Sequence, residues 1–527
     1  MAFISGKFLL FLAVFFLLYF VVPKKFRWIV LLAGSYVFYI VNSKTLTVFL
    51  IATTLAAFGA GLWLEHLNSS QKKALAAGRG SLDRAGKKAL KRSFQRKKRG
   101  VVTLVLLFNF GILGFLKYYN FFAENIGALF GFETGTLSLL LPLGISFYTF
   151  QSAGYIFDVY RGKCAADKNV AKFALFLSFF PQIVQGPIGR YGDLAGQLYK
   201  GHAFDAARIR DGILLIMWGC FKKLVIADRV YTAVSTIFGS SASFAGFELF
   251  FGAALYGLQV YTDFSGGMDI ARGVSRIFGI ELALNFERPY FARSLSEFWR
   301  RWHITLGSWM RDYVFYPLSL SKPFGKLGKA SRKLFGSYFG KMLPSFISMF
   351  IVFFFVGVWH GADWKYIIYG VYNGSIIVFS MICAPLYEKI IAKLKINTEC
   401  FSWRFYQMVR TFFISSVGRF FSMAASAGIA FSMIYRTFTV WNPWVLFDGS
   451  LLNYGLTATD YIVVAVAVLI VYLVSRRQER GQNVLALISR QNLLFRWLLY
   501  IGMFLVIAVF GVYGTGYNAA SFIYMQF

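Results

Sequence analysis

The sequence predicts an all-α polytopic membrane protein with about a dozen transmembrane helices. Of its 527 residues, 57% are hydrophobic, 20% are aromatic and only 15% are charged, which is unlike a soluble globular protein. Apolar runs of about 17–25 residues recur along the chain, and each can cross a hydrocarbon core of about 30 Å as a helix. The alternating pattern of an outer-membrane strand is missing, so the predicted spans are helical.

The chain is strongly basic, with 55 Lys and Arg against 23 Asp and Glu and a formal net charge of +32. The basic residues are concentrated between the apolar runs, where topology and anionic lipid headgroups account for them. The sequence therefore predicts contact with a lipid bilayer and no nucleic-acid partner. No metal site is expected, because there is no metal-ligand spacing among the four cysteines Cys164, Cys220, Cys383 and Cys400.

The first apolar run, residues 8–22, is predicted to be a retained span, because no small-residue cleavage site follows it. Two more spans are expected at 29–41 and 45–64. The segment 71–99 carries twelve Lys and Arg and one Asp, and should be a cytoplasmic loop. The basic residues at 24–27 then lie on the same side, which places the N-terminus outside.

In the second half of the chain, basic and base-poor segments alternate between the predicted spans in the same way. Basic loops at 322–341, 389–410 and 476–496 are predicted inside, and the segment 437–460, with almost no basic charge, is predicted outside. The C-terminus is then expected outside, like the N-terminus. The predicted spans of this half are 343–358, 364–384, 411–435, 461–474 and 497–512.

The apolar runs in the middle of the chain are shorter, and Pro142, Pro181 and Pro187 interrupt two of them. Helices broken at membrane depth usually line a cavity or re-enter the membrane. Interfacial and re-entrant helices are therefore expected beside the spans. These runs are 101–116, 137–157, 170–188, 212–230 and 247–262.

His303 lies in Glu-Phe-Trp-Arg-Arg-Trp-His-Ile-Thr-Leu (297–306), where aromatic residues recur at helical spacing. The pattern predicts one amphipathic helix at the interface, aromatic on one side and basic on the other. Arg300, Arg301 and Arg311 would form a cationic wall for an anionic substrate, because Arg binds phosphate in a bidentate manner. The alternative is a structural helix in which His303 makes one hydrogen bond.

His360 lies in Val-Gly-Val-Trp-His-Gly-Ala-Asp-Trp (356–364), at the end of an apolar run. Ionisable groups at membrane depth are costly and suggest function, and imidazole exchanges protons near neutral pH. Trp359 would wall a pocket, and Asp363 is close enough in sequence to orient the imidazole. The alternative is a core histidine satisfied by its neighbours. The loop topology places His360 toward the outer face and His303 toward the inner face.

Familiar catalytic motifs are missing from the sequence, which has no Gly-x-Ser-x-Gly, no P-loop and no His-Glu-x-x-His. Any chemistry must then rest on isolated polar residues inside a helical bundle. Acyl transfer from an activated thioester fits, because it requires mainly a general base and a bound donor. A transporter without chemistry is the alternative from another class, since interrupted helices are compatible with it.

Seven segments form a further set of motifs along the chain: PQIVQGPIGRY (181–191), YTDFSG (261–266), NFERPY (285–290), SEFWRRWHI (296–304), RDYVFYPL (311–318), WHGA (359–362) and SFIYMQF (521–527). Together they resemble the membrane-bound O-acyltransferase superfamily, and in particular the branch containing the bacterial alginate O-acetylation membrane protein. The resemblance extends over nearly the whole chain.

The resemblance implies a multi-helix fold around a central tunnel, with His360 as the catalytic base and His303 as a second catalytic residue. No cofactor would be bound permanently. Acetyl-CoA, the acyl donor, would enter from the cytoplasm, and an extracytoplasmic acetyltransferase-like or esterase-like partner would pass the acetyl group to a polysaccharide hydroxyl. The chain would lie in a bacterial plasma membrane. The substrate-binding candidates are Trp359, Asp363, Arg300, Arg301, Asn285, Asp263 and Arg311.

Two segments depart from that branch: the basic insert 71–99 is longer, and 320–341 is unusually rich in Lys and Gly. The D-alanyl transferases of teichoic acid modification share both histidine motifs and form the alternative. Two additional predicted spans after residue 460 favour the acetyl branch. A single membrane domain, 1–527, is expected, made of N-terminal spans (1–70), a basic cytoplasmic loop (71–100), a catalytic core (101–384) and C-terminal spans (385–527).

Overall fold

The computed structural model describes residues 3–78 and 80–513, and every regular element within them is a helix. The predicted all-α membrane class is confirmed, while the motif at 521–527 lies outside the described residues. The count of about a dozen spans stays a prediction. Six described segments are long and apolar enough to cross a membrane: Lys24–Ala77, Arg84–Phe130, Lys322–His360, Trp364–Ile382, Ala458–Glu479 and Leu493–Phe510.

The chain forms two compact units. The first comprises the described residues up to Gly212 together with Ala271–Ala283, and the second comprises Ile213–Ile270 and the described residues from Leu284 onward. Helix α11 (Phe247–Ile277) contributes to both units. The predicted catalytic core, 101–384, is likewise divided between them.

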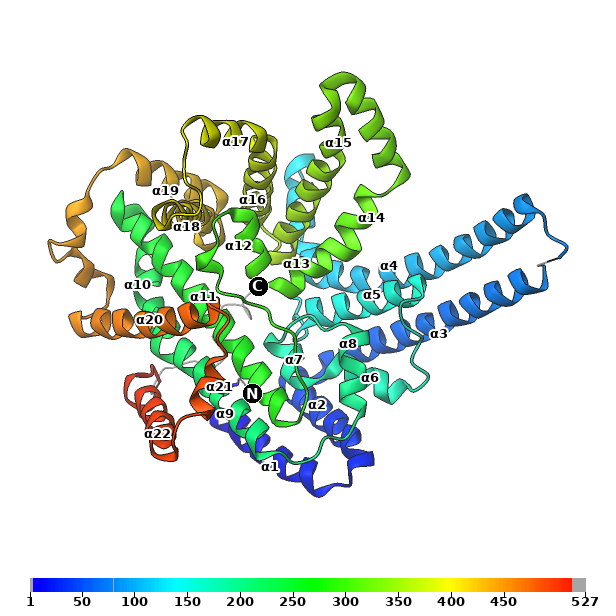
Figure 1. The fold of residues 1–527 in the computed structure, drawn as a ribbon, viewed down its shortest axis with the longest axis horizontal. Helices are drawn as coiled ribbons and strands as arrows, with labels where there is room; N and C mark the ends of the chain where they lie inside the picture. Colours follow the sequence, from blue (N-terminus) through cyan, green and yellow to red (C-terminus); the bar gives the residue numbers. More distant parts are fainter. Residues whose placement is uncertain (1–2, 79, 514–527) are drawn as a thin grey trace. The chain divides into compact units, whose positions relative to one another are not determined.

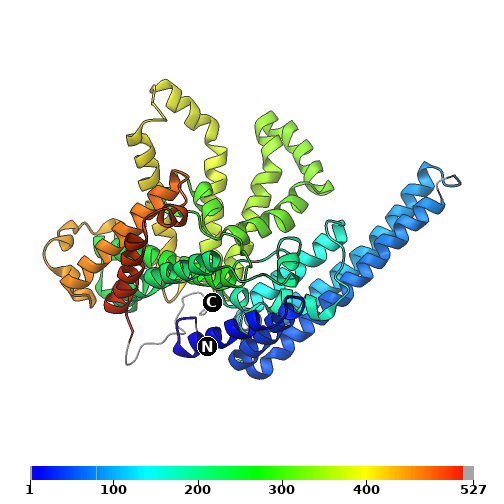
Figure 2. The same ribbon diagram turned by 60° about the horizontal axis from the view of Figure 1, so that its bottom comes forward.

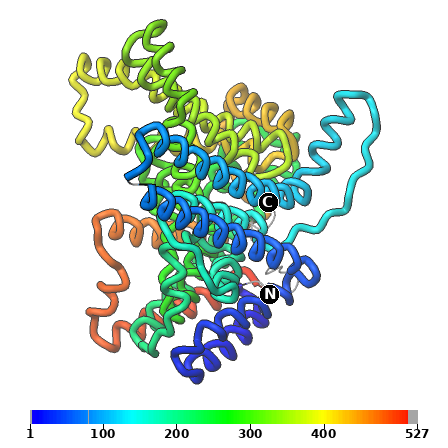
Figure 3. The backbone as a smooth tube through the Cα atoms, turned by 90° about the vertical axis from the view of Figure 1, so that its right-hand side faces the viewer, coloured from blue at the N-terminus to red at the C-terminus, as the bar shows by residue number. Residues whose placement is uncertain are grey.

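The first unit begins with two apolar helices and two long ones. Helices α3 and α4 pack along each other, as Figures 1 and 3 show. The segment 71–99, predicted as a loop, is therefore mostly helical, and only a short connection separates the two helices. Its Ala, Lys and Arg are strong helix formers, and the Asp83 carboxylate caps α4 by accepting from Gly86 N at 2.6 Å. The helices of this unit are α1 (Gly6–Val21), α2 (Arg27–Ser43), α3 (Thr47–Ala77), α4 (Arg84–Phe130), α5 (Ile145–Arg161), α6 (Val170–Ser178), α7 (Phe180–Gln185), α8 (Tyr191–Tyr199) and the start of α9 (Ala206–Cys220).

The interrupted apolar runs of this unit are broken where the prolines predict. Helix α5 starts only at Ile145, after Gly144 adopts a φ of 67°, and α6 ends before α7, which carries Pro181 in its first turn. A Cβ on Gly144 would lie 2.3 Å from the carbonyl oxygen of Ile183. Glycine is therefore required there both by the backbone conformation and by the close approach of α7.

The second unit contains the remaining helices, packed around a core to which α10, α11 and α18 contribute Ile237, Ala253 and Phe420. Two π-helical segments, Phe221–Ala227 and Arg311–Phe315, lie among them. The helices are α10 (Asp228–Gly239), most of α11, α12 (Leu295–Arg301), α13 (Ile304–Met310), α14 (Tyr316–Ser319), α15 (Lys322–His360), α16 (Trp364–Ile382), α17 (Ala384–Lys393), α18 (Phe401–Met423), α19 (Ala427–Thr439), α20 (Ala458–Glu479), α21 (Val484–Ser489) and α22 (Leu493–Phe510).

The structure differs from the predicted loop 322–341 and the predicted span 411–435 of this unit. The segment 322–341 is not a loop but the first part of α15, which reverses direction at Gly336 (φ 79°) into the hairpin visible in Figure 2. A Cβ on Gly340 would lie 2.3 Å from the Cα of Arg332, so glycine allows the two arms to meet. The predicted span 411–435 is divided into α18 and α19, because Ser426 caps the second helix by accepting from its Ile429 N–H.

Buried ion pairs join the π-helical segment Phe221–Ala227 to its neighbours. Lys223 Nζ lies 2.5 Å from Asp263 Oδ1 of α11 and 2.7 Å from Asp228 Oδ1 of α10. Lys222 Nζ lies 2.7 Å from Asp269 Oδ2. Charges are tolerated at such depth only when they are paired, so these lysines fix the start of α10 and the centre of α11 to one segment.

Replacing Lys223 with Met should lower the free energy of unfolding by about 3–5 kcal/mol, because the buried Asp263 and the mostly buried Asp228 lose their cation. Thermal unfolding of the detergent-solubilised protein measures the effect. The control is Lys326→Met, at an exposed position on α15. Equal unfolding temperatures for the two variants would contradict a stabilising role for the Lys223 pairs.

Candidate functional site

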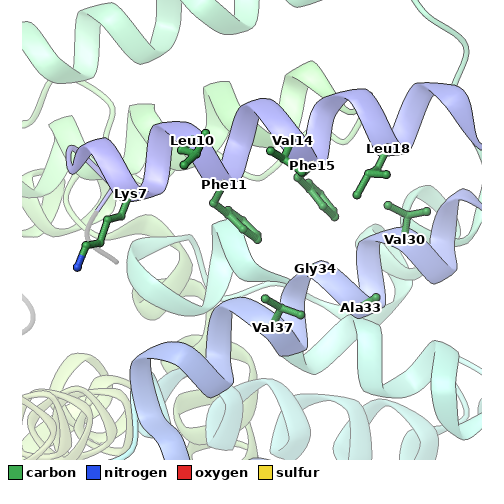
Figure 4. Close-up of a pocket in the computed structure, with 10 residues that line it drawn as sticks. All are labelled: Lys7, Leu10, Phe11, Val14, Phe15, Leu18, Val30, Ala33, Gly34 and Val37. Atoms are coloured by element: carbon green, nitrogen blue, oxygen red, sulfur yellow. The ribbon is translucent and has the colours of Figure 1, made fainter.

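Of two cavities lined by described residues, one contains groups suited to chemistry. The larger, of about 460 Å³, lies between α1 and α2 of the first unit. Figure 4 shows Phe11 and Phe15 of α1 facing Gly34 of α2, with Lys7 the only charged residue among those that line it. Its wall is almost entirely apolar, so it is a groove between two hydrophobic helices and has no catalytic groups.

The second cavity, of about 70 Å³, lies in the second unit and contains both predicted histidines. The prediction that His303 and His360 face opposite sides of the membrane is therefore wrong. It assumed that 322–341 is a surface loop and that His303 stays beside that loop. Instead 322–341 is helical, and His303 is buried at 3% exposure. The lining residues are Tyr256, Val260, Phe264, Phe298, Trp302, His303, His360, Tyr369, Asn373, Ser415, Arg419 and Ser422.

The helix predicted to carry His303 is broken at that residue. Helix α12 ends at Arg301, α13 begins at Ile304, and His303 itself adopts a left-handed conformation with φ 46° and ψ 53°. This conformation is strained for a residue with a Cβ, and surrounding contacts must hold it. The single amphipathic helix is therefore wrong at its centre, because the imidazole is turned into the protein.

Asn285 supplies the contacts that hold His303. Its Oδ1 accepts hydrogen bonds from Thr305 N at 3.0 Å and Thr305 Oγ1 at 2.8 Å, and His303 Nδ1 lies 3.2 Å away. Its backbone carbonyl accepts from Ile304 N at 2.9 Å. Because Asn285 Oδ1 is an acceptor, His303 Nδ1 carries the proton and Nε2 carries the lone pair. Asn285, predicted to bind substrate, is thus placed to orient the imidazole.

His303 is held in its neutral form. It lies outside the six candidate spans, and burial lowers its pKa to about 3, with the nearby His360 acting in the same direction. Aromatic rings surround it, with the Phe264 centroid at 5.1 Å and the Trp359 centroid at 5.4 Å. A neutral imidazole of fixed tautomer can orient or polarise a substrate without carrying charge.

His360 ends α15 and packs among aromatic rings. The centroid of Trp359 lies 5.0 Å from that of the imidazole, and those of Tyr369 and Tyr366 lie at 5.6 and 6.4 Å. Trp359 therefore contacts both histidines and fixes their spacing. Asp363 caps α16 by accepting from Lys365 N at 2.9 Å, so its carboxylate is engaged at a helix terminus.

The predicted cationic wall is not assembled at the cavity. Arg301 forms ion pairs with Glu297 at 2.8 Å and Glu479 at 2.9 Å, and Arg311 lies beside Asp312 with 57% of its side chain exposed. Arg300 is exposed and donates to Ser296 Oγ. Asp263, as described above, is buried against Lys223.

One charged residue that the sequence reasoning missed does line the cavity. Arg419 of α18 is buried at 7% exposure and reaches the same space as both imidazoles. Its position inside the predicted span 411–435 was an available signal, since ionisable groups at membrane depth suggest function. Within the described residues, no cluster of three or more His, Cys, Asp or Glu side chains could hold a metal ion.

The fold and the site together define a membrane protein with proton-accepting groups enclosed by aromatic walls. Residues 165–424, which include both histidines, match the membrane-bound O-acyltransferase (MBOAT) family. The chain is 31% identical to a probable alginate O-acetylase AlgI from Azotobacter vinelandii, over 85% of this chain and 80% of the relative. The chain belongs to the MBOAT family and is an acyltransferase.

Two other relatives differ in their named activities. A peptidoglycan O-acetyltransferase from Helicobacter pylori is 32% identical over 53% of this chain and 54% of its own. A teichoic acid D-alanyltransferase from Bacillus subtilis is 31% identical over 49% of this chain and 62% of its own. The similarity to the alginate acetylase thus covers more of both chains than these two matches.

Replacing His303 with Gln should lower turnover without shifting the acid limb of the pH–rate profile between about pH 5 and 8. A group with a pKa near 3 is already deprotonated throughout that range, so its loss removes no titration. The measurement is initial rate against pH for the wild type and the variant. A limb that disappears with His303 would show that His303 itself titrates there.

Proposed function

We propose that the protein transfers an acetyl group from acetyl-CoA toward a hydroxyl group of an extracytoplasmic polysaccharide, with His360 as the general base. The observation that carries this proposal is the joint placement of His360 and His303 in one small cavity, with Trp359 in contact with both. A cavity of about 70 Å³ has room for only a few water-sized groups, which suits a two-carbon acyl group.

The reaction needs two proton transfers and one bond exchange at the thioester carbon. His360 takes the proton of the acceptor hydroxyl, whose oxygen forms a C–O bond to the thioester carbonyl carbon. The C–S bond breaks, and the thiolate of coenzyme A leaves and takes up the proton. His303, neutral and with its lone pair on Nε2, orients the reacting groups, and Trp359 packs against both imidazoles.

The acceptor, the membrane, the partner and the donor complete the proposal. The names of the matched alginate and peptidoglycan acetylases support a polysaccharide acceptor. The bacterial plasma membrane and an extracytoplasmic acetyltransferase-like or esterase-like partner are proposed from the family resemblance. Acetyl-CoA is the proposed donor. Asn285 and Asp263 act by positioning, whereas Arg300, Arg301, Arg311 and Asp363 have roles outside the cavity.

D-alanyl transfer is the second candidate, favoured by the similarity to teichoic acid D-alanyltransferases. The neighbouring genes separate the two functions. A carrier protein and its ligase beside this gene would indicate alanine, and a secreted esterase-like protein would indicate acetate.

Replacing His360 with Ala should reduce release of coenzyme A from acetyl-CoA by about 100-fold or more, because general-base catalysis contributes about 10²–10⁴. The assay uses the purified full chain in lipid nanodiscs, followed by acetylation of the cell-surface polymer in cells. His66→Ala, at an exposed position on α3, is the matched control and should keep full activity. Full activity of the His360 variant would end its assignment as the base.

A further inference from the structure

Within the described part of the chain, the side chains that contact the Arg419 guanidinium are neutral. Its Nη1 donates to Ser416 Oγ at 2.8 Å, and its Nη2 donates to Tyr290 Oη at 3.2 Å and Ser415 Oγ at 3.3 Å. The guanidinium also lies 5.6 Å from the ring centroid of Tyr290 and 5.2 Å from that of Phe412. These contacts fix its position but do not neutralise its charge.

The backbone of α11 leaves space for this side chain. A Cβ on Gly257 would lie 2.1 Å from Arg419 Nη1, so the guanidinium occupies room that only glycine leaves. Tyr290 Oη in turn donates to the Gly257 carbonyl oxygen at 2.5 Å. The arginine, the tyrosine and the glycine therefore form one packed arrangement beside the histidines.

Arg419 differs from the other deeply buried cations of this unit. Lys222 and Lys223 each lie within 2.7 Å of an aspartate oxygen, whereas none of the ion pairs of residues 3–78 and 80–513 involves Arg419. A buried charge without a counter-ion is costly, and arginine remains protonated in proteins. The cavity that contains both imidazoles therefore keeps a fixed positive charge.

We propose that Arg419 selects the acyl group by its charge, so that the site accepts short uncharged acyl thioesters and rejects those that carry an ammonium group. This inference rests on the proposed acyl transfer and deepens it. A second cation in the cavity would lie near an unneutralised guanidinium at low local dielectric, where like charges repel strongly. The partial negative charge on a thioester carbonyl oxygen is favoured by the same field.

Two thioesters of nearly equal size provide the test. Propionyl-CoA and glycyl-CoA differ in a methyl against an ammonium group, and at about pH 6.5 an amino group with a pKa near 7.7–8.0 is mostly protonated. Release of coenzyme A is measured with the full chain in lipid nanodiscs. The wild type should prefer propionyl-CoA by about 100-fold in kcat/KM, because the guanidinium repels the ammonium group of glycyl-CoA.

Arg419→Gln should reduce that preference at least about tenfold, and Arg419→Lys, which keeps the charge, should retain it. A second pair of variants, at Ser415, tests the same charge effect in case Arg419→Gln does not fold. Ser415→Asp places a carboxylate beside the guanidinium and should also reduce the preference, whereas the uncharged Ser415→Asn should not. Thermal unfolding and size-exclusion profiles identify the variants that remain folded.

An unchanged preference in both Arg419→Gln and Ser415→Asp overturns the proposal, as does a wild type that uses the two thioesters equally. The proposed function fails in a different way: the wild type then releases no coenzyme A from acetyl-CoA, and the selectivity inference falls with it. Equal loss of preference in Arg419→Lys and Arg419→Gln would show that shape, and not charge, selects the acyl group.

Discussion

The candidate site depends on one amide oxygen. Asn285 Oδ1 accepts from both the backbone and the hydroxyl of Thr305 and lies within hydrogen-bond distance of His303 Nδ1, so it holds a strained backbone and fixes an imidazole tautomer together. A left-handed histidine persists only when its surroundings determine it. Without this acceptor, the three donors would lose this hydrogen-bond partner, and a buried donor left unsatisfied costs about 1–3 kcal/mol. The break between α12 and α13, the burial of His303 and its contact with Trp359 all follow from this arrangement.

Buried charges of the second unit are satisfied in two distinct ways. Around the π-helical segment, lysines and aspartates neutralise each other and join helices that would otherwise have only apolar contacts. Beside the histidines, Arg419 is satisfied by hydroxyl groups and aromatic faces. The first arrangement stabilises the helix packing, and the second leaves an electric field in the cavity. Buried cations of this unit thus differ in whether they have a carboxylate partner.

The aromatic residues of the site pack around the imidazoles. Trp359, Tyr369 and Phe264 surround the imidazoles, and Tyr369 and Phe264 also line the cavity. Rigid rings exclude water at little cost in conformational entropy, and a dry site strengthens the electrostatic effect of any fixed charge or lone pair. The small volume and the neutral His303 are consistent with a short acyl group as the substrate.

The sequence by itself determined the membrane class, the helical content and the two histidines, because composition, apolar length and local motifs are properties of contiguous residues. It also determined where Pro142 and Pro181 interrupt helices. Only the tertiary structure decided that 71–99 and 322–341 are helical, since helix formers in a basic segment resemble a charged loop until packing is known. It alone brought His303 to the same cavity as His360 and added Arg419 to them. These residues lie far apart in the chain, and their meeting depends on helix packing, a left-handed backbone at His303 and the space beside Gly257.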